Sequence, residues 1–235
     1  MTPLLQKEIK MNYSDRRGKR VLFVGNCLLN QNIRGFGAAV TEGVFADLMQ
    51  VLVKHGIGIE QLPCPECLVW GGIRRRSLYR WQPFVFNSVG KWWFPVLQFF
   101  IRLNIFLTHT RVSKREAKKA VDWMADHMRQ GFEVVGVVMA NDSPTCGVTK
   151  TIDLFDVLKQ ARTFGMTLDD LENPRIEKIK PFTQFMLVDG SGAFGGAIVG
   201  ELRKRQMDIP VIGWDLWEKP EEEATRIAEL LRISP

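Results

Sequence analysis

The chain has 235 residues, of which 46% are hydrophobic and 25% charged, and it carries a formal net charge of +6 at pH 7. This ordinary globular composition leaves room for a substantial core, and four cysteines in a chain this long exclude a disulfide framework. No apolar signal segment follows the basic start, so we expect reduced thiols, a cytoplasmic location and a flexible tail over residues 1–19.

Apolar strand patterns alternate with amphipathic helix patterns after residue 19. Strands are predicted at 20–25, 57–62, 132–140, 182–188 and 209–212. Helices are predicted at 41–55, 113–130, 151–162, 195–205 and 221–231, with Ser113 as the N-cap of the second helix. This alternation predicts one α/β domain over 20–235, with a mostly parallel open sheet and helices on both faces, as in Rossmann or flavodoxin-like folds.

The segment 71–112 interrupts this alternation and is predicted to be an inserted, aromatic-rich helical segment. It contains three consecutive arginines and an apolar run from Trp92 to Thr108 that polar residues interrupt, so it is too short and too polar to span a membrane. Residues 80–110 are expected to pack on their own domain, a homodimer partner or another protein, or to lie on a membrane surface. Contact with nucleic acid is the least favoured alternative.

Three cysteines follow three of the predicted strands: Cys27, Cys64 and Cys146. The carboxyl ends of neighbouring parallel strands meet at one edge of a sheet, where open α/β proteins bind ligands. Prolines stiffen the turns Pro63-Cys64-Pro65 and Ser143-Pro144-Thr145-Cys146-Gly147, which favours fixed thiols over core filling. Three convergent thiolates without an evident fourth ligand indicate a metal or iron–sulfur site with a vacant position.

The motifs Cys27-Leu28-Leu29-Asn30, Cys64-Pro65-Glu66 and Ser143-Pro144-Thr145-Cys146-Gly147, in this order, resemble the thiouracil desulfidase family over about residues 20–72 and 132–215. The resemblance implies a [4Fe–4S] cluster held by Cys27, Cys64 and Cys146, with one iron lacking a protein ligand. It also implies removal of sulfur from a small thiolated molecule, such as a thio-nucleobase. The chain departs from the family pattern at residues 30–34 and in the insertion.

Such a reaction needs a group that moves protons near the thiols. Glu60 is the first choice, because it precedes Cys64 by four residues and would face the same side of an extended strand. Asp142 and Ser143, beside Cys146, are the other catalytic candidates, although both residue types also form turns. Asn30 is expected either to orient the substrate or to cap a helix.

Two other motifs leave alternatives open. Cys64-Pro65-Glu66-Cys67 fits the C-x-x-C pattern of a redox dithiol. Residues 190–195 fit G-x-G-x-x-G, with Asp215 where a ribose-binding acid would stand, so Gly190 and Gly192 are candidates for holding a dinucleotide or another anion. The rival functions are therefore a dinucleotide-binding oxidoreductase and a non-catalytic iron–sulfur protein that docks through the insertion.

Overall fold

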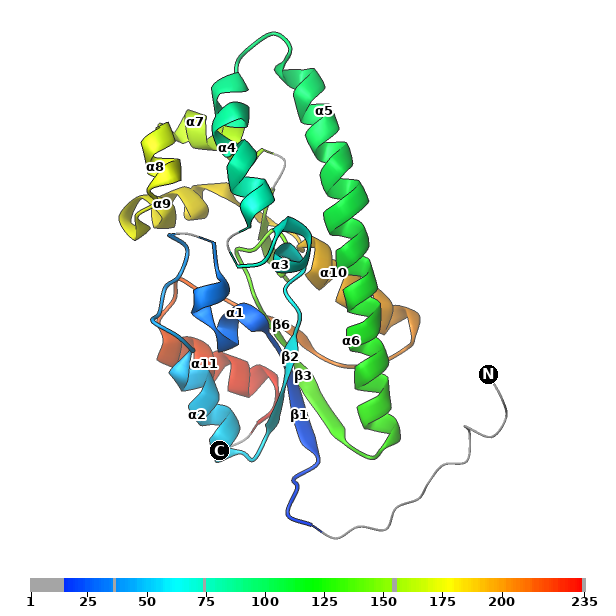
Figure 1. The fold of residues 1–235 in the computed structure, drawn as a ribbon. Coiled ribbons are helices and arrows are strands. Elements are labelled where there is room, and N and C mark those ends of the chain that lie inside the picture. The colour runs from blue at the N-terminus through cyan, green and yellow to red at the C-terminus, as the bar shows by residue number, and fades with distance from the viewer. Residues whose placement is uncertain (1–14, 36, 74, 154–155, 234–235) are drawn as a thin grey trace, which may run out of the picture.

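The computed structural model describes residues 15–233 except 36, 74, 154 and 155, so most of the tail expected at 1–19 lies outside the described residues. A central sheet of four parallel strands runs in the order β2-β1-β3-β6. Its strands are β1 (Arg20–Gly25), β2 (Gly58–Leu62), β3 (Glu133–Ala140) and β6 (Val211–Trp214). The predicted α/β class with a parallel open sheet is confirmed (Figure 1).

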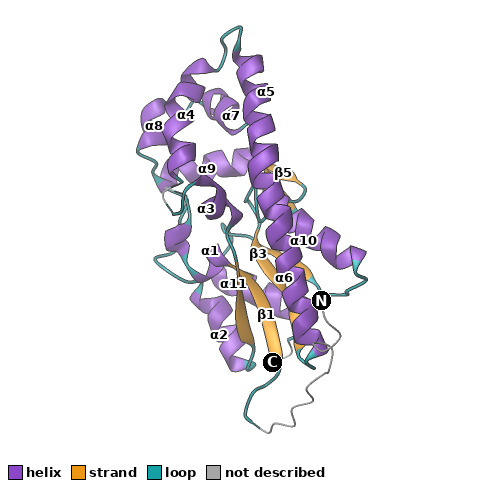
Figure 2. Cartoon of the chain, turned by 45° about the vertical axis from the view of Figure 1, so that its right-hand side comes forward, coloured by secondary structure: helices purple, strands orange, loops and turns teal. Residues whose placement is uncertain are grey.

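Helices cover both faces of this sheet (Figure 2). Helices α2 (Ala46–Lys54) and α11 (Pro220–Leu230) cover one face, and α6 (Arg111–Arg129) and α10 (Ala193–Lys204) cover the other. Alternate residues of β1 point to the two faces, so that Leu22 joins the first core and Phe23 the second. A strand buried on both sides must be apolar throughout, which explains the continuous runs in β1 and β3.

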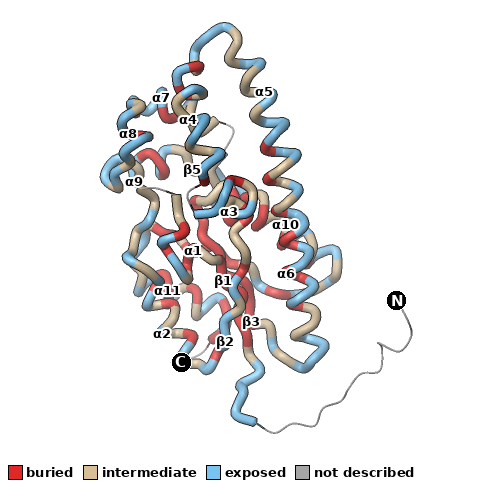
Figure 3. The backbone as a smooth tube through the Cα atoms, in the orientation of Figure 1, coloured by how far each residue is buried: buried red, intermediate tan, exposed pale blue. Residues whose placement is uncertain are grey.

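A separate helical layer lies at the carboxyl end of the sheet. The insertion forms a hairpin of α4 (Arg76–Ser88) and α5 (Phe94–Ile105), and α5 continues through the π-helical segment η3 (Phe106–Thr110) into α6. Helices α7 (Val157–Phe164), α8 (Leu168–Glu172) and α9 (Ile176–Met186) lie beside the hairpin, and Phe86 of α4 packs into their small core. Figure 3 shows that buried residues concentrate in the central strands, whereas α4 and α5 remain largely exposed or half-buried.

The strand predicted at 182–188 is wrong over most of its length. Residues up to Met186 belong to α9, and only β5 (Leu187–Asp189) is extended, pairing antiparallel with β4 (Lys150–Ile152) outside the central sheet. A short apolar run fits a strand or a buried helix equally well, and here Phe182 is needed on a helix facing the α7–α9 core. The helix predicted at 151–162 likewise begins only at Val157.

Two other helix starts differ from the predictions. The helix expected from Thr41 begins at Ala46. Ser113 is not an N-cap but a buried residue inside α6, because the inserted helix runs on into α6 without a break. The remaining strands and helices lie within two residues of their predicted bounds.

Candidate functional site

The topology brings the three predicted ligands to the same edge of the sheet. Cys27 lies on the short helix α1 (Asn26–Leu29) after β1, and Cys64 caps helix α3 (Pro65–Trp70) after β2. Cys146 lies in the turn that follows β3, and it is buried, whereas Cys27 and Cys64 are half-buried. Since β2 and β3 flank β1, the three thiols come from three adjacent strands.

Burial and neighbouring cysteines raise the pKa values of Cys146 and Cys64. Burial raises the pKa of Cys146, and negative charge on Cys27 raises it further. The pKa of Cys64 is also raised, first by its hydrogen bond with Cys67 and then by burial, with smaller contributions from Glu66 and Cys146. Within the described residues, no three His, Cys, Asp or Glu side chains stand close enough to hold a single metal ion. The donor set, four free thiols, is nonetheless the one that iron–sulfur clusters use.

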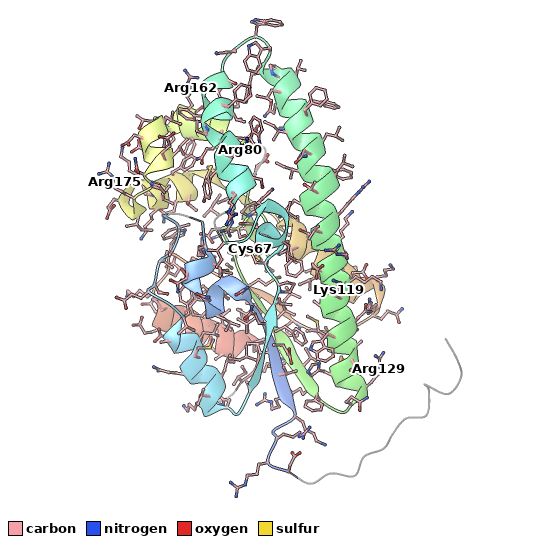
Figure 4. The ribbon with its side chains drawn as sticks, viewed as in Figure 1. Cys67, Arg80, Lys119, Arg129, Arg162 and Arg175 are labelled. Carbon is pink, nitrogen blue, oxygen red and sulfur yellow. The ribbon has the colours of Figure 1, made fainter. Side chains whose placement is uncertain are left out.

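Cys67 is the acidic thiol of the site. It lies on α3, about one turn after Cys64 (Figure 4). The hydrogen bond from Cys64 and the positive charge of Arg75 lower its pKa to about 7, against an opposing effect of burial. A half-buried thiol with this pKa is about half ionised at pH 7 and can therefore act as a nucleophile.

A hydrogen-bonded chain ties α3 to the insertion and to the Cys146 turn. The Glu66 carboxylate accepts hydrogen bonds from Arg75 Nε at 2.9 Å and from Thr145 Oγ1 at 2.7 Å. The Thr145 hydroxyl has one proton, which it donates to Glu66, so it accepts from His109 Nε2 at 2.9 Å. The His109 ring stacks on Trp70 with centroids 4.9 Å apart, and burial lowers the pKa of His109. The chain thereby fixes the turn that carries Cys146.

Sequence reasoning missed most of this chain of contacts. It treated the histidines as structural and noted Glu66 only as a neighbour in the turn. The sequence signal for these contacts was Arg75, one of three consecutive arginines. In the structure its guanidinium also donates a hydrogen bond to the Ile33 carbonyl at 2.8 Å.

Asp142 is a buried acid with few polar contacts. Neither carboxylate oxygen makes a hydrogen bond of good geometry, although the Trp217 indole N–H is close enough to lower the pKa of Asp142. Its nearest cation is Arg34, with Nη2 at 4.0 Å. Burial raises the pKa of Asp142 to about 6, although Arg34 opposes the shift. The backbone has a positive φ of 46° here, which is uncommon for a residue other than glycine. Backbone strain and a buried acid with so few hydrogen bonds together indicate a functional position.

Ser143 has a structural contact pattern. Its Oγ accepts hydrogen bonds from the backbone N–H groups of Thr145 at 3.2 Å and Cys146 at 3.0 Å, which closes the turn around Cys146. The Ser143 hydroxyl also lowers the pKa of Cys146, against the larger effect of burial. Ser143 therefore orients and polarises this thiol.

Glu60 and Asn30 do not join the cysteines in the structure. The Glu60 carboxylate lies 3.5 Å from Nε2 of His127 on α6, and Glu66 is the glutamate whose charge raises the pKa values of all three predicted ligands. The Asn30 side chain accepts a hydrogen bond from the Asn32 N–H at 3.0 Å and so caps the short helix η2 (Gln31–Ile33).

The glycine-rich turn at 190–195 packs against the Cys146 turn. The Gly190 and Gly192 N–H groups donate to the carbonyls of Thr149 and Gly147, both at 2.9 Å, and Phe194 N–H donates to the Thr145 carbonyl at 2.7 Å. These amides are thus already used, so the cofactor-binding role predicted for Gly190 and Gly192 does not fit. Asp215, the expected ribose-binding acid, accepts a hydrogen bond from Asn141 Nδ2 at 2.8 Å.

A cavity of about 770 Å³ lies between the α4–α5 hairpin and helices α7–α9. Aromatic and aliphatic side chains dominate its lining, including Trp70, Tyr79, Phe100 and Phe182. Trp70 is the last residue of α3, the helix that Cys64 caps and that contains Cys67, so α3 contributes to the cavity lining and carries two of the thiols. Cavities of this size and character hold small organic molecules in other proteins.

The fold and the site define an α/β protein with free thiols at the carboxyl edge of a parallel sheet. No family model matches this chain, and no solved structure matches it. It is similar to an uncharacterized protein of Methanocaldococcus jannaschii, with 23% identity over 164 residues, or 69% of this chain and 90% of that protein.

Proposed function

We propose that this protein is a [4Fe–4S]-dependent desulfidase that removes sulfur from a small thiolated molecule. The observation that supports the proposal is the position of Cys27, Cys64 and Cys146, which follow three adjacent strands at one edge of the sheet, with the buried acid Asp142 in the turn after the third strand. Three soft thiol donors suit a cluster that leaves one iron without a protein ligand. When bound, such a cluster would supply a Lewis-acidic iron for the substrate sulfur.

The chain's own residues would handle the proton and the charge. The net reaction exchanges the substrate sulfur for the oxygen of water and releases hydrosulfide, without net oxidation or reduction. Asp142, with a pKa of about 6, exists in both protonation states near neutral pH and is our candidate for the proton-transferring group in place of Glu60. Arg34, 4.0 Å from this carboxylate, would stabilise its ionised form. The contacts of Glu66 and Thr145 would keep the Cys146 turn in position.

Anaerobic purification with quantification of iron and sulfide tests the cluster. We expect about four irons per chain in the wild type. Cys27→Ser, Cys64→Ser and Cys146→Ser should each lose most of this iron. Cys67→Ser is the matched control, because it removes a thiol from the same helix that is not among the proposed ligands, and it should keep its iron. A wild type that takes up no iron, or a Cys67→Ser variant as depleted as the other three, would contradict the proposal.

Release of sulfide from 2-thiouracil tests the activity separately. Iron-loaded wild type should release sulfide, whereas Asp142→Asn should retain its iron and lose most of the activity. If the iron-loaded wild type releases no sulfide from thiolated bases, the protein is a non-catalytic iron–sulfur protein and the desulfidase proposal is wrong.

A second function is favoured by one observation, the acidic thiol of Cys67 hydrogen-bonded to Cys64. This pair could act as a redox dithiol, whose thiolate attacks a disulfide. Such a function requires both Cys64 and Cys67 but not Cys27 or Cys146. Reduction of insulin disulfides that Cys67→Ser abolishes and Cys27→Ser leaves intact would therefore establish the dithiol in place of the desulfidase.

A further inference from the structure

The insertion presents an apolar stripe along helix α5 and its continuation. The stripe consists of six side chains that are 40–61% exposed, namely Val96, Phe99, Phe100, Leu103, Phe106 and Leu107. Their spacing of three or four residues places them on one face of the helix, about 17 Å long at 1.5 Å per residue. Trp92, 91% exposed in the turn before α5, extends the apolar surface to the tip of the hairpin. Monomeric proteins rarely leave so contiguous an apolar surface in water without a function for it.

The charged side chains of the insertion itself have one sign, and Arg102 among them lies 3.5 Å from Asp156 outside the insertion. Residues 71–112 contain seven arginines and lysines and no aspartate or glutamate. Lys91 at the tip lies 5.8 Å from the ring centroid of Trp93, and Arg80 on α4 lies 5.8 Å from that of Trp81. Exposed Arg111 and Lys114 follow the stripe at its other end. An apolar face with a basic border and tryptophans is the pattern of helices that lie in the headgroup region of anionic membranes.

The alternatives fit these observations less well. A second copy of the chain would bring an acid-free basic segment against itself, and like charges across an interface oppose association. Nucleic acid would leave the six apolar side chains of the stripe without a partner. Among the described residues, no helix is long and apolar enough to cross a membrane, so contact would be at the surface.

We propose that the α4–α5 hairpin docks the protein on an anionic lipid surface. The stripe enters the headgroup region, and Lys91, Arg80 and Arg111 attract the lipid charges. This proposal is independent of the desulfidase activity, since no residue of the stripe belongs to the thiol site.

Co-sedimentation of the full chain with lipid vesicles tests the docking. Vesicles of phosphatidylcholine with about one third phosphatidylserine should bind the protein at least tenfold more strongly than pure phosphatidylcholine vesicles, and salt should weaken this binding. The triple variant Phe99→Ser, Leu103→Ser, Phe106→Ser, none of whose positions lines the cavity, should lose tenfold or more in binding, and Lys91→Glu should lose several-fold.

The matched control is Val53→Ser on α2, because Val53 is 78% exposed but lies far along the chain from the hairpin. It should bind like the wild type. Circular dichroism of every variant checks that helix content is retained, and light scattering of the lipid-free protein reports its oligomeric state. Failure of the wild type to bind anionic vesicles would overturn the proposal. A dimer that the triple variant converts to a monomer, without vesicle binding, would assign the stripe to a second copy.

Discussion

Replacing Asp142 by asparagine should make the protein more stable at neutral pH. The carboxyl group is buried, and burial raises its pKa from 3.8 to about 6 in the fold. Each pKa unit corresponds to about 1.4 kcal/mol, so ionised Asp142 lowers the stability at pH 7 by roughly 3 kcal/mol relative to the protonated acid. Asparagine is neutral, similar in shape, and tolerates the positive φ at this position.

The sign follows from proton binding. The folded state binds the Asp142 proton more tightly than the unfolded state, so this stabilisation is complete below pH 3.8 and is lost as the pH rises to about 6. Asp142→Asn removes this dependence. The pKa of about 6 already includes the attraction to Arg34 at 4.0 Å, so the expected gain at pH 7 is about 2–3 kcal/mol.

Urea unfolding of both proteins at pH 4 and pH 8, at equal iron content, measures the effect. The informative quantity is the difference between the two proteins, because acids with lowered pKa values, such as Asp170, contribute equally to both. The advantage of the variant should be larger at pH 8 than at pH 4. A difference in unfolding free energy that stays constant between these pH values would refute the reasoning.

Three further predictions concern the elements around the thiols. Gly195→Ala should destabilise the protein by more than about 1 kcal/mol, because a Cβ there would collide with the Gly147 and Cys146 carbonyls. Gly200→Ala in the same helix places its Cβ in open space and should stabilise the protein by up to about 1 kcal/mol, and thermal unfolding compares the two variants. Glu66→Gln should lower the free energy of unfolding by about 2 kcal/mol, because buried Arg75 loses its carboxylate partner. The control in urea unfolding is Glu42→Gln at an exposed position, and equal losses of stability in the two variants would contradict the prediction. In metal-free protein, alkylation of Cys67 by iodoacetamide, measured by mass spectrometry, should become faster as the pH rises through about 7, while buried Cys146 stays unreactive. In Cys64→Ala this rise should move to higher pH, and an unchanged pH profile would contradict the hydrogen bond between Cys64 and Cys67.

The sheet and the placement of the cysteines were predictable because each depends on short-range pattern. A strand buried on both faces needs an unbroken apolar run, and β1 and β3 have one. The thiols then follow from chain order, since parallel strands end at a common edge. The helical nature of the insertion was predictable for the same reason, because a long periodic segment without strand alternation favours a helix.

Other features depended on contacts between distant residues. Glu60 and Glu66 both lie near Cys64 in the chain, but Glu60 contacts His127 of α6, whereas Glu66 reaches Thr145, 79 residues away. The glycine motif at 190–195 has the spacing of a phosphate-binding turn. Only packing against the Cys146 turn shows that its amides already have partners.

The sequence by itself determined the four strands of the central sheet and the edge at which Cys27, Cys64 and Cys146 follow them, because burial on two faces and chain direction leave few other solutions. Only the tertiary structure decided which acid near these cysteines is desolvated. Desolvation of Asp142 depends on what surrounds it in space, namely Arg34, Trp217 and the closed turn, and no local spacing contains that information.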